Sequence, residues 1–472
     1  MLFFFLPRML SALATILILV VLTRVLTPAD FGKYSMTLLI GYVGFAFTFA
    51  WLSASIPRFH HAERYGGRAT ASILVIAAVL ACLLIPLVAL AFAVPWPAAT
   101  LFVLGAAYSL GHATHELGLS GLRVLKAGPQ YAAATLLRPT LAVALALAFV
   151  QNGWGYEGAV WGFVIGATTT GAISLLYVIR QTGLSKPDRE MIKAFLVYGK
   201  PLAVVTSMSS FFLLASQSLL GALESLEAVG YFAAAQTLAM RSIRMPMSNL
   251  SAVAAASVFK AQETASVDAV DGQMRRHFSF LILFVLPIAL VLFCANQTIA
   301  ALFFDSEFQT ETAQNLRLLA VAALLLGLQG AYFSYAFTLS RRTSLQLGVT
   351  LATLATHVLV SWGCIVVFGP LGASVGFVVS AILSISVFHL VGRKIHKSLL
   401  PVQEIGKALI GVCVLAPIAL YTNQINSLPV AITVLVLGVL AFWIVLMLAQ
   451  QTAAQAVLSN LRRRLRKSPA AN

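Results

Sequence analysis

Ionisable side chains interrupt a long apolar stretch at residues 111 to 118, which read GHATHELG. On a helix His112 and Glu116 share one face, whereas His115 directly precedes the glutamate. The order HxxHE differs from the HExxH pattern of zinc proteases, and no other Cys, Asp or His stands where it would supply a third ligand. We therefore expect a polar cluster here, without a metal, another cofactor or a catalytic centre.

Arg138 is a second unusual charge, because it follows about eight residues of another apolar stretch and precedes Pro139. At about 1.5 Å of rise per residue, it lies roughly 12 Å from the nearer end of that helix. A charge at the centre of a bilayer costs roughly 2.5–3.5 kcal/mol on insertion scales, so we expect Arg138 to face the protein interior. The alternative is that its long stem lets the guanidinium reach the nearer headgroups.

Glu116 is the only acidic residue that we place inside a predicted membrane span, because Glu157 stands at the external end of its span. Three roles are open to it: an ion pair with Arg138 on the next helix, a proton-coupling pair with His112, or a carboxylate in a cytoplasmic vestibule near Arg123. The ion pair has a functional form as well, in which a competing anion breaks it. We accordingly predict that His112, His115 and Glu116 act in coupling or gating.

The elements that carry these residues are membrane helices. The chain has 472 residues, of which 60 % are hydrophobic and 10 % charged, and its mean hydropathy is +0.92, outside the range of soluble domains. Apolar runs of about 20 residues recur from end to end, which predicts an all-α integral membrane protein with about fourteen transmembrane helices. The predicted spans are residues 3–26, 36–57, 71–94, 98–121, 131–150, 156–179, 194–221, 228–249, 277–304, 314–339, 345–368, 371–391, 406–422 and 429–450.

The distribution of charge predicts the orientation of these helices. If both termini are cytoplasmic, 27 of the 31 Lys and Arg residues lie at cytoplasmic ends, and only Arg24, Lys33, Arg138 and Arg317 do not. The net charge of +16 therefore reflects topology, and we do not expect nucleic acid as a partner. The basic tail at residues 461–467, LRRRLRK, is expected to bind anionic membrane lipids.

Two distant segments nearly match: GYEGAVWGFV at 155–164 and GPLGASVGFV at 369–378 agree at six of ten positions, at an offset of 214. At an offset of 215, Lys126 falls on Arg341, and FGKY at 31–34 weakly resembles VGYF at 229–232. We predict two parallel six-helix lobes, an N-lobe at 1–193 and a C-lobe at 194–400, followed by two helices and a basic tail at 401–472. Duplicated lobes without a GxxxxGK[ST] phosphate loop are typical of secondary transporters.

The segment LTRVLTPADFGKYSMTLLIG, residues 22 to 41, resembles the start of Wzx-type polysaccharide flippases in its arginine, leucine and Gly-aromatic pair. EGAVWGFVIG at 157–166 and LGASVGFVVS at 371–380 resemble the openings of helices 6 and 12 in the same superfamily of multidrug, oligosaccharidyl-lipid and polysaccharide exporters. The resemblance implies that the chain flips an undecaprenyl-pyrophosphate-linked oligosaccharide to the periplasmic leaflet of the bacterial inner membrane by alternating access. It also implies a polymerase or glycosyltransferase of the same pathway as a partner.

A pyrophosphate that crosses a bilayer needs cations along its route, and arginine provides a permanent, bidentate charge. We predict Arg24, Arg138, Arg241, Arg244 and Arg317 as substrate-binding residues, with positions at helix ends as the alternative explanation for Arg24, Arg241, Arg244 and Arg317. The alternative function is a drug or organic-cation antiporter of the same superfamily, which would be expected to carry acidic groups in its cavity. A membrane glycan polymerase or ligase is less well supported, because the external loops are too short to hold catalytic groups.

Overall fold

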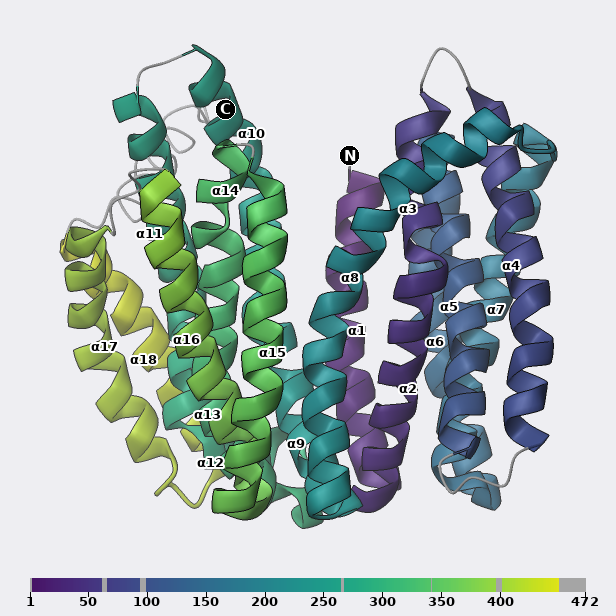
Figure 1. Cartoon of the computed structure of the whole chain (residues 1–472). Helices are drawn as coiled ribbons and strands as arrows, with labels where there is room; N and C mark the ends of the chain where they lie inside the picture. Colours follow the sequence, from purple (N-terminus) through teal and green to yellow (C-terminus); the bar gives the residue numbers. More distant parts are fainter. Residues whose placement is uncertain are drawn as a thin grey trace, which may run out of the picture. The chain divides into compact units, whose positions relative to one another are not determined.

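The computed structural model describes residues 2–61, 66–93, 99–264, 267–340, 342–395 and 401–449, and the regular structure in these ranges is helical (Figure 1). Contacts between Cα atoms divide the chain into two compact units, Met1–Ala233 and Ala234–Asn472. The lobe boundaries predicted at 193/194 and 400/401 stay predictions. The basic tail at 461–467 and Arg341 lie outside the described residues.

In the described residues, the first unit holds eight α-helices and the start of a ninth, with the π-helical turn η1 (Val150–Trp154) between α6 and α7. They are α1 (Leu2–Val25), α2 (Pro28–Thr48), α3 (Ala50–His60), α4 (Gly67–Ala93), α5 (Ala99–Val124), α6 (Gly128–Phe149), α7 (Gly155–Thr182), α8 (Arg189–Leu223) and α9 (Leu226–Ala239). The second unit continues from α9 with η2 (Met240–Arg244), α10 (Met245–Thr264), α11 (Val267–Cys294), α12 (Asn296–Phe303), α13 (Ser306–Leu328), η3 (Gln329–Phe333), α14 (Tyr335–Leu339), α15 (Thr343–Phe368), α16 (Gly372–Ile395), α17 (Val402–Thr422) and α18 (Leu428–Leu448).

Seven helical stretches among the described residues are long and apolar enough to cross a membrane, or eight if the bent pair α2 and α3 forms one span. Three of the seven each contain two α-helices: 128–182 holds α6 and α7, 344–395 holds α15 and α16, and 306–339 holds α13 and the short α14. An all-α, multi-span membrane protein is thus confirmed, whereas the number of fourteen crossings stays a prediction. The predicted single span at 36–57 is two helices that meet at Phe49 with a bend of 43°.

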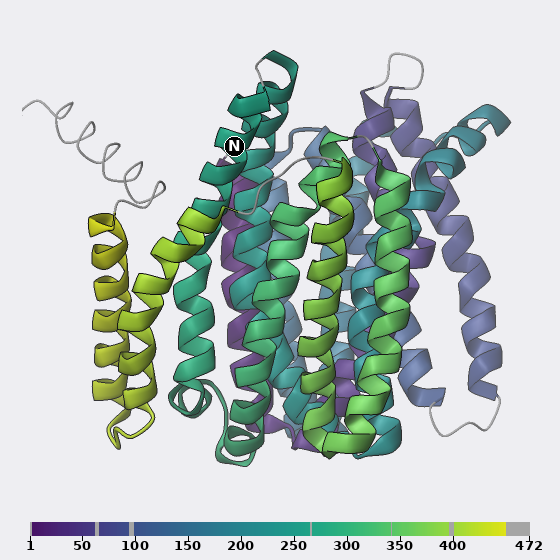
Figure 2. The same ribbon diagram turned by 60° about the vertical axis from the view of Figure 1, so that its left-hand side comes forward.

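The two matching sequence segments have the same local structure. Gly155 (φ 50°, ψ −141°) and Gly369 (φ 61°, ψ −138°) occupy the same left-handed conformation at the turns before α7 and α16. A Cβ atom at Gly162 would overlap the backbone of Ala146, and one at Gly376 would lie 2.7 Å from the Cα of Ser361. The pairs α6–α7 and α15–α16 therefore cross at equivalent small residues, which supports a duplication of the chain. The second pair lies side by side in Figures 1 and 2.

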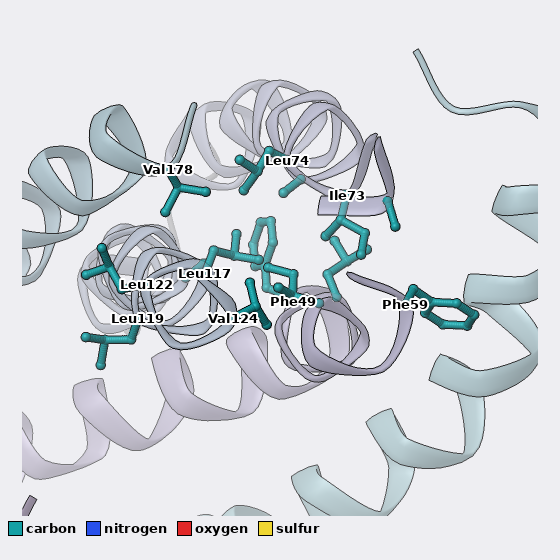
Figure 3. Packing of buried hydrophobic residues seen from close by; sticks show 14 of the residues in the cluster. Phe49, Phe59, Ile73, Leu74, Leu117, Leu119, Leu122, Val124 and Val178 are labelled. Atoms are coloured by element: carbon teal, nitrogen blue, oxygen red, sulfur yellow. The ribbon is translucent and has the colours of Figure 1, made fainter. Parts of the chain in front are cut away.

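The core of the first unit gathers where α3, α4 and α5 meet (Figure 3). Leu74 of α4, Leu117 and Leu122 of α5 and Phe49 beside α3 are nearly inaccessible, and Val178 of α7 closes the cluster. Because lipid tails are as apolar as these side chains, helices in a bilayer associate by close packing more than by hydrophobic burial. This packing fixes α5, which carries the GHATHELG segment.

In the second unit, polar bonds fix the α17–α18 hairpin to α11. Ser279 donates to Glu404 (3.0 Å), Trp443 Nε1 donates to the carbonyl of Leu283 (3.1 Å), and Asn423 Nδ2 donates to the carbonyl of Cys294 (2.7 Å). Glu404 is fully buried, with Arg275 at 3.6 Å and Lys407 at 3.8 Å. Glu404 stands in the first turn of a helix that qualifies as a span, two residues before the predicted start at 406.

Candidate functional site

Arg138 of α6 reaches across to α5, where it meets three side chains. Its Nη2 donates to the hydroxyl of Tyr108 (3.1 Å) and to Nδ1 of His112 (3.0 Å), and its Nη1 lies 4.0 Å from Oε1 of Glu116. A guanidinium has donors only, so His112 must accept through Nδ1, and its imidazole is neutral with the proton on Nε2. We call Tyr108, His112, Glu116 and Arg138 the arginine cluster.

The arginine cluster is closed on one side and accessible on the other. Tyr42 and Phe45 of α2 place their rings edge-on against His112, with centroids 4.9 and 4.5 Å away, and the Tyr108 ring stacks on the imidazole. Tyr108 is 1 % exposed, whereas the side chains of Arg138 and Glu116 are 18 % and 30 % exposed. Neutral acceptors thus hold the guanidinium from the buried side, and the carboxylate contacts it from the accessible side.

The distance between Arg138 and Glu116 shows how firmly they are paired. Charge-assisted N–H···O bonds are about 2.7–2.9 Å long, so a separation of 4.0 Å is an ion pair without a hydrogen bond. Of the three roles predicted for Glu116, the structure contains the contact that the first one requires, the ion pair with Arg138. Glu116 compensates the positive charge of Arg138 without accepting a hydrogen bond from it. The Nη1 donors of Arg138 are therefore able to bind an anion.

His115 takes no part in the bonds to Arg138. Its Nδ1 lies 3.0 Å from the hydroxyl of Thr170 on α7, and the residue is 2 % exposed. The two histidines of GHATHELG therefore contact different helices: His112 binds Arg138 of α6, and His115 binds α7. The structure brings His112, Glu116 and Arg138 together, and His115 lies beside them.

The other predicted arginines lie apart from such networks. Arg24 and Arg241 are exposed, and neither has a hydrogen-bond or ion-pair partner among the described residues. Arg244 is half-buried at the end of the π-helical turn η2, also without a partner in the described part of the chain. The guanidinium of the exposed Arg317 lies 5.0 Å from the ring centre of Phe293. Their role in substrate binding stays a prediction.

Tyr108 was not singled out from the sequence, because an apolar span does not show which face of the helix meets Arg138. It stands four residues before His112 and eight before Glu116, so the three share one face of α5. This spacing, together with an arginine deep in the following span, is the signal that would have identified it.

The repeat predicted from the sequence offers an internal comparison for the arginine cluster. The two copies align at an offset of 214 between α5 and α13 and at an offset of 215 between α6 and α15. The crossing glycines Gly162 and Gly376, like the turns at Gly155 and Gly369, also align at an offset of 214. The positions equivalent to Tyr108, His112, Glu116 and Arg138 are then Ala322, Leu326, Gly330 and Thr353. The second copy has neutral residues at all four positions and keeps the helix pairs α13–α16 and α15–α16.

Comparisons with known proteins identify a family and a fold. A family described as polysaccharide biosynthesis protein matches residues 1–259, whereas the comparison with curated protein sequences gives no significant match. Among solved structures, a lipid II flippase MurJ in an inward closed conformation shares 12 % identity over 94 % of this chain and 98 % of its own, with a TM-score of 0.74.

Multidrug transporters of the MATE family have a similar fold. An inward-facing member of the MOP superfamily has a TM-score of 0.60 at 18 % identity, covering 82 % of this chain and 90 % of its own. An outward-facing one has a TM-score of 0.53 at 18 % identity, covering 84 % and 93 %. These identities show a shared fold alone. The resemblance to the flippase superfamily found in the sequence is confirmed, and the chain belongs to the polysaccharide biosynthesis protein family, with the fold of membrane transporters and lipid flippases.

Proposed function

We propose that the protein is a flippase that moves an undecaprenyl-pyrophosphate-linked oligosaccharide from the cytoplasmic to the periplasmic leaflet of the bacterial inner membrane. The observation that carries the proposal is the arginine cluster, whose permanent cation has neutral partners on its buried side and a carboxylate at 4.0 Å on its accessible side. The family and the flippase-like fold support a lipid-linked substrate.

The geometry of the arginine cluster suits an anion that binds and leaves again, such as a phosphate, better than a ligand that stays bound. An anion that reaches Arg138 replaces Glu116 as the partner of the guanidinium, and it gains bidentate bonds that Glu116 does not make at 4.0 Å. When the anion leaves, Glu116 neutralises the arginine again. Glu116 thus lowers the cost of the empty site and limits the affinity of the filled one, as a carrier that must release its cargo requires.

The route of the substrate through the protein starts in the cytoplasm. Both termini are cytoplasmic, and the headgroup enters from the cytoplasm and binds Arg138, aided by Arg24 and by Arg241, Arg244 or Arg317. Rocking of one lobe against the other exposes it outside while the prenyl tail stays in lipid. A polymerase or glycosyltransferase of the pathway acts as a partner on either side, and the protein itself catalyses no covalent step.

A second candidate is an organic-cation antiporter, because the multidrug transporters share the fold and Glu116 is an accessible carboxylate. The two functions predict substrates of opposite charge. Purified protein in liposomes should move an undecaprenyl-pyrophosphate-linked oligosaccharide across the bilayer, measured by its access to a membrane-impermeant enzyme added outside. No movement, together with export of a cationic dye driven by a proton or sodium gradient, would assign the protein to the antiporters.

A further inference from the structure

The two halves of the predicted repeat share a polar bond between helices at equivalent positions, and the second half has a further bond between α13 and α16, from Ser374 to Asn315. In the first copy, Nδ1 of His115 on α5 lies 3.0 Å from the hydroxyl of Thr170 on α7. In the second copy, the hydroxyl of Ser384 on α16 donates to Oε1 of Gln329, at the end of α13, over 2.9 Å. The partners are 55 residues apart in both bonds, and both residues of the first bond map onto the second at the offset of 214.

Close packing places these partners within reach of each other. A Cβ atom at Gly171, next to Thr170, would lie 2.5 Å from the backbone nitrogen of His115, so α7 approaches α5 at the level of the histidine. His115 is 2 % exposed and Thr170 is 2 % exposed. The bond is thus buried at a helix crossing. In the other copy, Gln329 makes the equivalent bond with a side chain that is not ionisable.

We infer that His115 is a positioning residue whose neutral hydrogen bond to Thr170 fixes the rotation of α5 against α7. His112 and Glu116 are carried by the same helix, one turn or less away, so this rotation directs them toward Arg138. Gln329 and Ser384 form the equivalent bond in the second copy. His115 therefore carries no proton in the transport cycle, in contrast to the coupling role predicted from the sequence. This inference depends on the proposed function only for its transport measurement.

The chain itself provides the conservative substitution for the test. His115→Gln installs the residue that the second copy uses, and its amide can either donate to or accept from Thr170. His115→Leu and Thr170→Val each remove the bond while they keep an apolar helix surface. Interhelical hydrogen bonds in membranes correspond on average to about threefold in an equilibrium constant, and at most to about twentyfold.

The first measurement is a double-mutant cycle of unfolding in detergent with His115→Leu, Thr170→Val and the double variant. We expect each single variant to lower the folding equilibrium constant at least about threefold and the double variant to add little. His115→Gln should unfold like the wild type. Additive losses, or a His115→Leu variant as stable as the wild type, would overturn the bond as a positioning contact.

The second measurement is transport by each variant in liposomes, normalised to folded protein. We expect His115→Gln to retain the wild-type rate and its dependence on pH, and His115→Leu to transport more slowly. A His115→Gln variant that folds like the wild type but transports nothing would show that the imidazole is needed, and the inference would be wrong. If the wild type moves no lipid-linked oligosaccharide, the proposed function fails, whereas the unfolding cycle still decides the role of His115.

Discussion

Glu116→Gln tests the competition between the carboxylate and a substrate anion for Arg138. The substitution preserves the size of the side chain and removes its charge, so the guanidinium loses the ion pair at 4.0 Å and keeps its bonds to Tyr108 and His112. If an incoming phosphate must replace the carboxylate, the variant should bind the anion more tightly than the wild type does.

The distance sets the size of this effect. Two unit charges 4.0 Å apart interact by about 4 kcal/mol at an effective dielectric constant of about 20 and by about 1 kcal/mol in bulk water. Arg138 and Glu116 are 18 % and 30 % exposed, so solvent screens part of the interaction. We take about 1–2 kcal/mol, which corresponds to a decrease of roughly five- to thirtyfold in the dissociation constant.

The assay is equilibrium binding of radiolabelled undecaprenyl pyrophosphate to purified protein, with Glu157→Gln as the matched control. Glu157 is an exposed carboxylate at the start of α7, so its loss should leave the dissociation constant unchanged. Equal or weaker binding by Glu116→Gln, with unchanged folding, would refute the competition and leave Glu116 with a structural role.

Two further predictions concern stability. Gly162→Ala should lower the melting temperature in detergent, because the added methyl overlaps the backbone of Ala146. Gly363→Ala is the control: its methyl meets no atom within 4 Å, so this variant should melt like the wild type. Equal melting temperatures of the two variants would contradict the helix crossing at Gly162. Glu404→Ala should lower the free energy of unfolding by about 1–3 kcal/mol, because the buried hydrogen bond from the Ser279 hydroxyl to this carboxylate is lost. Chemical denaturation measures this loss, and an unchanged midpoint would mean that the α17–α18 hairpin does not depend on Glu404.

Long apolar runs make the helices predictable, but their ends follow other rules. Hydropathy locates the part of a helix that matches lipid and not the whole helix, so α13 begins at Ser306, eight residues before the predicted 314. Its first turns carry Glu307 and Glu311, which suit a helix that extends beyond the hydrocarbon. The break at Phe49 and the π-helical turn η2 leave no mark in hydropathy, because they depend on the packing of neighbouring helices.

The candidate site was predictable in part. Arg138 and Glu116 are charges on adjacent helices in apolar surroundings, so the expense of burying each one alone predicts their contact. The side of α5 that meets α6 depends on helix rotation, which is why Tyr108 was missed and His115 was grouped with His112. The equivalence of His115 with Gln329 needed the offset of the repeat together with the observed hydrogen bonds.

We propose that Arg138 binds the phosphate of a lipid-linked oligosaccharide during transport. The most direct test measures movement of an undecaprenyl-pyrophosphate-linked oligosaccharide in liposomes that contain the wild type, Arg138→Ala or Arg138→Lys in equal folded amounts. We predict movement by the wild type, none by Arg138→Ala, and a reduced rate for Arg138→Lys, because an ammonium keeps the charge but loses the planar fork. Wild-type movement by Arg138→Ala would contradict the account.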